Sequence, residues 1–118
     1  MGKRTRSQRR GSSPKNKVNS HRFPAANRLP RKTDEVAEII DLIHSPAHTA
    51  PLAKLKFQDG TVGHFAAPEG TSVGQNIAFG ENVSLRPGNV TTLDRIPEGT
   101  PVCNVELRPG DGGKFARS

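Results

Sequence analysis

The sequence predicts an all-β domain, a small barrel of short strands, preceded by a long basic arm. Short apolar or alternating stretches recur at intervals of about 10–15 residues, as in small barrels. The 12 glycines and 10 prolines of this 118-residue chain fall mostly between those stretches. Eleven of the 18 basic residues lie in residues 1–32, which contain no acid, and this predicts the arm.

The charge of the chain is divided unequally. Residues 33–118 hold 7 basic and all 11 acidic residues and sum to −4, whereas the arm carries +11. A clustered charge acts on a binding partner, and a dispersed one mainly aids solubility. We therefore expect an anionic partner for the arm.

The arm has too few large apolar residues to fold alone. Burying Val18, Phe23 and Leu29 would contribute roughly 5–8 kcal/mol. Ordering some 30 residues costs on the order of 30–50 kcal/mol of backbone entropy. The arm is therefore predicted to be disordered in isolation and to become ordered only by binding an anionic partner.

The spacing residues of the arm favour nucleic acid over a membrane surface. They are Ser, Gly, Gln, Asn, Thr and Pro, which suit hydrogen bonds to phosphate and sugar, and no apolar anchor stands beside the charges. No run of about 18 apolar residues and no apolar N-terminal signal appears. A mitochondrial transit peptide is the alternative, but its arginines would line a helix, which Gly11, Pro14, Pro24 and Pro30 oppose.

The first predicted strand covers Val36–His44. Its apolar residues do not alternate strictly, which indicates a bulge. A short helix is the competing interpretation, and Ile39–Ile40 and Pro46 argue against it. Further strands are expected at residues 76–80 and 101–107, and no helix pattern appears.

The stretch LAKLKFQDGTVGHFAAP predicts a β-hairpin that turns at Asp59–Gly60. Ala53, Leu55 and Phe57 would share its buried face. Lys54 and Lys56 would share the other, as a phosphate-binding patch or as an ordinary solvated face.

The residues that could carry other chemistry do not form a site. His44 and His48 have a metal-like spacing, but Pro46 lies between them and there is no C-x-x-C. We expect Cys103 to be a small buried apolar residue rather than a nucleophile. A single cysteine also indicates a reducing compartment. No catalytic residue, metal, cofactor or small-molecule substrate is predicted.

The chain lacks Trp and Tyr, and Phe57, Phe65 and Phe79 fit a core. This disfavours stacking on single-stranded bases and favours recognition of folded RNA. The glycine-rich end LRPGDGGKFARS adds three basic residues, among glycines whose backbone N–H groups could approach phosphate. A flexible terminus is the alternative there.

Several segments resemble the universal "L two" family of large-subunit ribosomal proteins, in its archaeal form. The resemblance is carried by GKRTRSQRRG, IIDLIHSPAHTAPLAKLKFQDG, AAPEGTSVGQ and, most specifically, GNVTTLDRIPEGTPVCNVELRPGDGGKFARS. It implies an OB-like barrel followed by an SH3-like barrel. It also implies binding of large-subunit rRNA near the peptidyl-transferase centre and support of subunit association.

The resemblance divides the chain into a basic rRNA-threading arm (1–33), an OB-like barrel (34–95) and the incomplete start of an SH3-like barrel (96–118). The family continues beyond this point, so we expect a truncated chain. The family's catalytic-centre histidine would lie in the missing part, and no histidine of this sequence inherits its role.

The resulting expectation is a structural ribosomal protein of the cytoplasm, not an enzyme, with rRNA and neighbouring ribosomal proteins as partners and no membrane. The alternative is a free OB-type RNA-binding translation or RNA-chaperone factor. The predicted rRNA-binding residues are Lys3, Arg4, Arg6, Arg9, Arg10, Lys15, Lys17, Arg22, Arg28, Arg31, Lys32, Lys54, Lys56, Arg108, Lys114 and Arg117.

Overall fold

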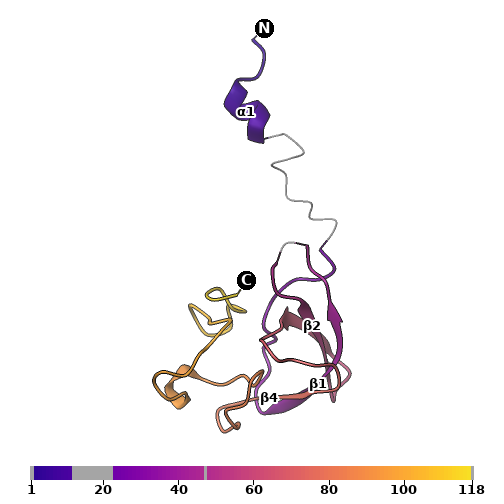
Figure 1. The fold of residues 1–118 in the computed structure, drawn as a ribbon, viewed down its shortest axis with the longest axis vertical. Coiled ribbons are helices and arrows are strands. Elements are labelled where there is room, and N and C mark those ends of the chain that lie inside the picture. The colour runs from indigo at the N-terminus through magenta and orange to yellow at the C-terminus, as the bar shows by residue number, and fades with distance from the viewer. Residues whose placement is uncertain (1, 12–22, 47, 118) are drawn as a thin grey trace.

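The computed structural model describes residues 2–11, 23–46 and 48–117. Their strands form one antiparallel sheet in the order β3-β2-β1-β4 (Figure 1). With little helix beside this sheet, the expectation of an all-β, OB-like fold is confirmed. The elements in chain order are α1 (Arg6–Gly11), β1 (Glu35–Ile43), β2 (Leu52–Phe57), β3 (Val62–Ala66), β4 (Asn76–Phe79) and the 3-10 turn η2 (Leu93–Arg95).

Strand β1 is the centre of the sheet and pairs with both β2 and β4. Its pairing with β2 shifts between Ile39 and Asp41, so the predicted bulge is confirmed at Ile40. Ala37 and Ile39 are buried, whereas Glu38 and Ile40 face outward. The extra residue bends the strand, so that β1 can pair with both β2 and β4 in a curved sheet.

Strands β2 and β3 form the predicted hairpin. Gly60 adopts φ +85° in the turn, a conformation that glycine takes without strain. The Asp59 carboxylate accepts a hydrogen bond from Thr61 N at 2.8 Å, and Phe57 N donates to Thr61 O at 3.0 Å. The DG pair therefore shapes this turn as its sequence indicated.

The core lies on the inner face of the sheet. The rings of Phe57 and Phe79 pack at a tilt with centroids 5.4 Å apart. Burial of each large side chain contributes about 1.5–3 kcal/mol, so this cluster is the main source of stability. Its buried members are Ala37, Ile39, Ala53, Leu55, Phe57, Phe65, Ile77 and Phe79.

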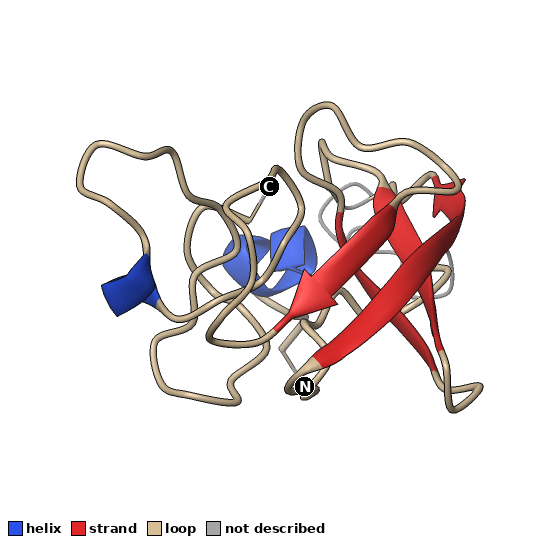
Figure 2. Cartoon of the chain, turned by 90° about the horizontal axis from the view of Figure 1, so that it is seen from below, coloured by secondary structure: helices blue, strands red, loops and turns tan. Residues whose placement is uncertain are grey.

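The segment after β4 forms a second lobe built mostly of loops (Figure 2). It is joined to the sheet by Val90, whose N–H donates to Ala78 O at 3.0 Å and whose carbonyl accepts Gly80 N at 3.0 Å. The Asn89 side chain reinforces this junction by accepting Ala78 N at 3.1 Å.

The predicted strand at residues 101–107 is wrong. Only an isolated bridge, Val105 with Phe115, forms there. Asn104 takes the left-handed φ of +54°, which interrupts an extended run. Cys103 on one side of it is exposed, so the expectation of a buried cysteine is also wrong.

Two parts of the arm have a defined structure. Residues 27–32 lie against the barrel, because Leu29 packs on the core and Arg28 pairs with His64 along the free edge of β3. Residues 6–11 form helix α1, although no helix was expected. Among the described residues, neither α1 nor η2 has the length and hydropathy to cross a membrane.

Candidate nucleic-acid interface

Helix α1 begins with a capping arrangement that the sequence TRSQ could have revealed. Thr5 N donates to Gln8 Oε1 at 3.3 Å, and Gln8 N points back to Thr5 Oγ1 at 3.5 Å. Such a reciprocal pair satisfies two N–H groups that a helix start leaves free. The helix ends at Gly11 with two arginines in its last turn, where positive charge is favoured.

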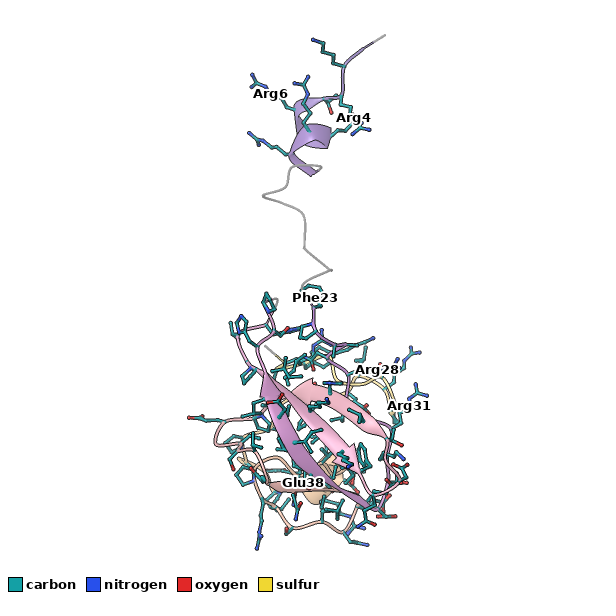
Figure 3. All side chains as sticks on the ribbon, turned by 90° about the vertical axis from the view of Figure 1, so that its right-hand side faces the viewer. Arg4, Arg6, Phe23, Arg28, Arg31 and Glu38 are labelled. Atoms are coloured by element: carbon teal, nitrogen blue, oxygen red, sulfur yellow. The ribbon has the colours of Figure 1, made fainter. Side chains whose placement is uncertain are left out.

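The tip of the arm, residues 2–11, is basic and exposed throughout. Arg9 Nε donates to Arg4 O at 2.9 Å and ties the extended residues to the helix. Figure 3 shows Arg4 and Arg6 projecting from this region away from the barrel. Three predicted residues, Lys15, Lys17 and Arg22, lie outside the described residues.

The root of the arm, residues 27–32, is built into the barrel. Ala66 N donates to Asn27 Oδ1 at 2.9 Å, Arg28 N donates to His64 O at 3.3 Å, and Leu29 N donates to Gly112 O at 2.8 Å. These bonds fix where the arginines of the root leave the surface. Arg28 and Arg31 extend side by side at one edge of the barrel (Figure 3).

Lys32 differs from the other predicted cations of the root. Its Nζ lies 2.6 Å from Asp59 Oδ2 and 3.4 Å from Glu35 Oε1, and 5.3 Å from the centroid of the Phe57 ring. The hydrogen bond to Asp59 raises the pKa of Lys32, and the same contact lowers the pKa of Asp59. The ammonium therefore has internal partners and joins the arm to the β2–β3 turn.

The glycine-rich loop (residues 106–113) meets the root of the arm. Glu106 is half-buried, and its carboxylate accepts Gly110 N at 3.0 Å and Gly112 N at 2.9 Å. The carbonyl of Gly110 accepts Arg31 Nε at 2.9 Å. Sequence analysis missed Glu106, for which the only signal was one acid within a basic, glycine-rich stretch.

For Gly110 and Gly112, this arrangement differs from the expectation that the glycine-rich loop could offer N–H groups to phosphate. The N–H groups of Gly110 and Gly112 already donate to Glu106, and the carbonyls of these two glycines accept Arg31 Nε and Leu29 N. The loop therefore holds Arg31 in place at the root of the arm.

The basic residues of the C-terminal stretch have different surroundings. Lys114 Nζ lies 3.5 Å from Asp111 Oδ2, with its side chain 55% exposed. Arg117 Nη1 donates to Asn27 O at 3.4 Å and to Gly113 O at 3.2 Å. This guanidinium group therefore links the C-terminal stretch to the root of the arm. Arg108 is exposed beside the same loop.

Lys54 and Lys56 lie on the outer face of β2. Across the sheet Lys54 is opposite Asp41, and Lys56 is opposite Glu38. Each lysine thus has an acid as its cross-strand neighbour, which weakens this face as a phosphate-binding patch. On its other side Lys54 is opposite His64, which in turn pairs with Arg28 of the root.

His48 and His64 have different surroundings. Ser45 Oγ lies 2.9 Å from His48 Nδ1, a contact that closes the loop between β1 and β2. Burial, aided by the charge of Lys54, lowers the pKa of His64. Within the described residues no three His, Cys, Asp or Glu side chains are placed to hold a metal ion.

The comparisons with known proteins agree with the basic arm and the barrel. Residues 3–79 match the family model described as "Ribosomal Proteins L2, RNA binding N-terminal domain". Residues 86–118 match "Ribosomal Proteins L2, C-terminal domain".

Similar curated proteins include several named large ribosomal subunit protein uL2. That of Archaeoglobus fulgidus is 46% identical over all of this chain and 51% of its own length. The protein of Natronomonas pharaonis is 47% identical over all of this chain and 50% of its own length. That of Methanopyrus kandleri is 42% identical over all of this chain and 51% of its own length. The chain thus spans about half the length of these relatives, and it belongs to the ribosomal protein L2 family.

Proposed function

We propose that this chain is a structural constituent of the cytoplasmic large ribosomal subunit that binds large-subunit rRNA. The observation that carries the proposal is the pairing of an acid-free basic tip with a root whose arginines are held on the barrel. Its tip would enter folded rRNA, and its root would fix the barrel at the surface of the same RNA. The role is one of assembly and scaffolding rather than of an enzyme.

Charge neutralisation is the physical basis of the proposed binding. Arginine suits phosphate because its planar fork donates two parallel hydrogen bonds and also stacks on bases. The tip has no acid in residues 2–11 to compete with phosphate for these donors. By kinship with the family, we place the bound rRNA near the peptidyl-transferase centre, with neighbouring ribosomal proteins as further partners and a supporting role in subunit association.

The proposed rRNA contacts are weighted by their surroundings. Lys3, Arg4, Arg6, Arg9 and Arg10 of the tip, with Arg28 and Arg31 of the root, are the principal ones. Arg108, Lys114 and Arg117 would add contacts beside the glycine-rich loop. Lys32 has internal partners and Lys54 and Lys56 face acids, so we propose minor contributions from them.

A free OB-type RNA-binding factor is the competing function, and the aromatic residues do not favour it. Such a protein stacks bases on exposed rings of its sheet. Phe57, Phe65 and Phe79 are buried, and the exposed Phe23 and Phe115 lie on other segments.

Crosslink mapping in purified ribosomes tests the proposal. The chain is expressed in an archaeal host, and ultraviolet crosslinks from it to RNA are located residue by residue. We expect residues 4–10 to crosslink to interior large-subunit rRNA. Absence of the chain from ribosomes, or crosslinks to messenger RNA, would replace the proposal with the free RNA-binding factor.

A further inference from the structure

We propose that Glu106 is a positioning residue for RNA binding, which strengthens the binding of a polyanion although it is itself an anion. The inference rests on the proposed function, because it concerns how the same surface holds RNA phosphate. A carboxylate within a basic surface would ordinarily repel phosphate. Here it lies behind the surface and holds the loop on which two arginines lie.

The first step is the loop itself. The carboxylate oxygens of Glu106 each accept one backbone N–H, from Gly110 at 3.0 Å and from Gly112 at 2.9 Å. Hydrogen bonds to a charged acceptor are roughly twice as strong as neutral ones. Two of them from one side chain fix the direction of the intervening peptide groups.

The second step leads from the loop to the root of the arm. With their N–H groups turned toward Glu106, the carbonyls of Gly110 and Gly112 accept Arg31 Nε at 2.9 Å and Leu29 N at 2.8 Å. Both glycines are therefore hydrogen-bonded through N–H and carbonyl alike within the protein. Arg31 lies near Arg28 at one edge of the barrel (Figure 3).

The third step is the close fit of the arginines on the glycines. A Cβ atom on Gly112 would collide with the Arg28 side chain, and one on Gly110 would come within 3.1 Å of Arg31 Nε. The stem of Arg28 and the guanidinium group of Arg31 therefore lie directly on the loop backbone. Removing the restraint that Glu106 supplies should loosen both guanidinium groups at once, and an arginine that must be ordered on binding costs affinity.

The test compares two substitutions that remove the same charge from the same C-terminal region. Glu106→Gln keeps the size of the side chain but replaces one acceptor with a donor facing an N–H. Glu98→Gln removes an exposed carboxylate. Binding of the 118-residue variants to protein-free large-subunit rRNA from Archaeoglobus fulgidus, whose related protein is 46% identical, is measured at several salt concentrations.

We expect Glu106→Gln to weaken binding about tenfold and to make the slope of log K against log salt shallower by about 1. Glu98→Gln should leave affinity unchanged or raise it up to about twofold, as loss of a distant negative charge predicts. Equal or tighter binding of Glu106→Gln would overturn the inference.

A double-mutant cycle separates positioning from general damage to the fold. If Glu106 acts through Arg28 and Arg31, then Glu106→Gln should have little further effect in a background that carries both Arg28→Gln and Arg31→Gln. Full additivity would overturn the inference. The amide proton resonances of Gly110 and Gly112 should move in Glu106→Gln, while those of β1 and β2 stay in place.

Arg31→Lys keeps the test decisive if Glu106→Gln does not fold. It retains the charge but lacks the Nε donor to Gly110 O, so we expect about threefold weaker binding, whereas a simple charge effect predicts none. Failure of the wild-type chain to bind the rRNA would instead contradict the proposed function. Wild-type binding that is insensitive to both Glu106→Gln and Arg31→Lys would contradict only the positioning role.

Discussion

Lys32 Nζ and Asp59 Oδ2 lie 2.6 Å apart and connect the root of the arm to the turn between β2 and β3. The two residues are 27 positions apart in the chain. Their contact holds the segment just before β1 against the β2–β3 hairpin, whose strand β2 pairs with β1. Lys32 was predicted from the sequence to bind RNA, but in the structure its ammonium group pairs with a carboxylate of the same chain.

This contact predicts a pH dependence. The hydrogen bond to Lys32 lowers the pKa of Asp59 in the folded state. The contribution of the Asp59 carboxylate to the free energy of unfolding is therefore fully present above its unfolded pKa of about 3.9, and it is lost as pH falls below that value. The pKa of Lys32 is raised, so its contribution to the free energy of unfolding depends on pH in the opposite direction. That contribution is present below the unfolded pKa of about 10.4 and is lost as pH rises further.

Lys32→Met should therefore return the pKa of Asp59 toward its usual value, measured by NMR titration of the carboxyl group. Lys56→Met is the matched control on the outer face of β2, and it should leave the pKa of Asp59 as it is. An unchanged Asp59 pKa in Lys32→Met would show that another group holds the carboxylate ionised.

The second prediction concerns Gly113. Its φ of +88° disfavours any side chain, and a Cβ there would collide with the buried side chain of Asn104. Gly70 has a similar φ of +80°, but a Cβ there would meet no atom within 4 Å. Gly70→Ala should cost about 1–2 kcal/mol of unfolding free energy and Gly113→Ala clearly more, by denaturant unfolding. Equal costs would mean that the contact with Asn104 is unimportant.

A third prediction tests the core against the second lobe. Phe79 is 1% exposed and packs on Phe57, whereas Phe115 is 54% exposed. Phe79→Ala should destabilise the chain by about 3–5 kcal/mol. Phe115→Ala should cost under about 1 kcal/mol, because little of its ring leaves water on folding. Similar losses in thermal unfolding would contradict the assignment of the core to the sheet.

The fourth prediction concerns the tip of the arm. Replacing Arg4 and Arg6 with Gln should make the salt slope of rRNA binding shallower by about 1.5, because each phosphate contact contributes roughly 0.7–0.9 to it. Arg86 and Arg95 are exposed on the second lobe, and their replacement removes the same charge. That control should leave the slope nearly unchanged. A loss of equal size in both variants would mean that net charge, and not the arm, decides binding.

The strands that the sequence predicted well are those with strong local signals. The DG turn, the alternation of β2 and the irregular run at Ile39–Ile40 predicted the hairpin and the bulge, because turn geometry and side-chain period are local properties. The strand expected at residues 101–107 was wrong because Asn104 takes a left-handed conformation that its neighbours in the sequence do not signal.

The interface depended on contacts between distant segments and was less predictable. Charge clustering identified the basic residues, but it could not separate Lys32, which is paired internally, from Arg28 and Arg31. The capping residues Thr5 and Gln8 were a readable signal for α1 that was outweighed by Gly11 and the prolines after it. The role of Glu106 requires the fold, since its loop meets residues some 80 positions earlier in the chain.

The salt dependence of binding to protein-free large-subunit rRNA tests most directly whether the basic arm holds the RNA. If the tip and root together contact about six phosphates, log K should fall with log salt with a slope of roughly −4 to −5. A slope near −1 would contradict this role, because it would mean that the basic arm contributes little to binding.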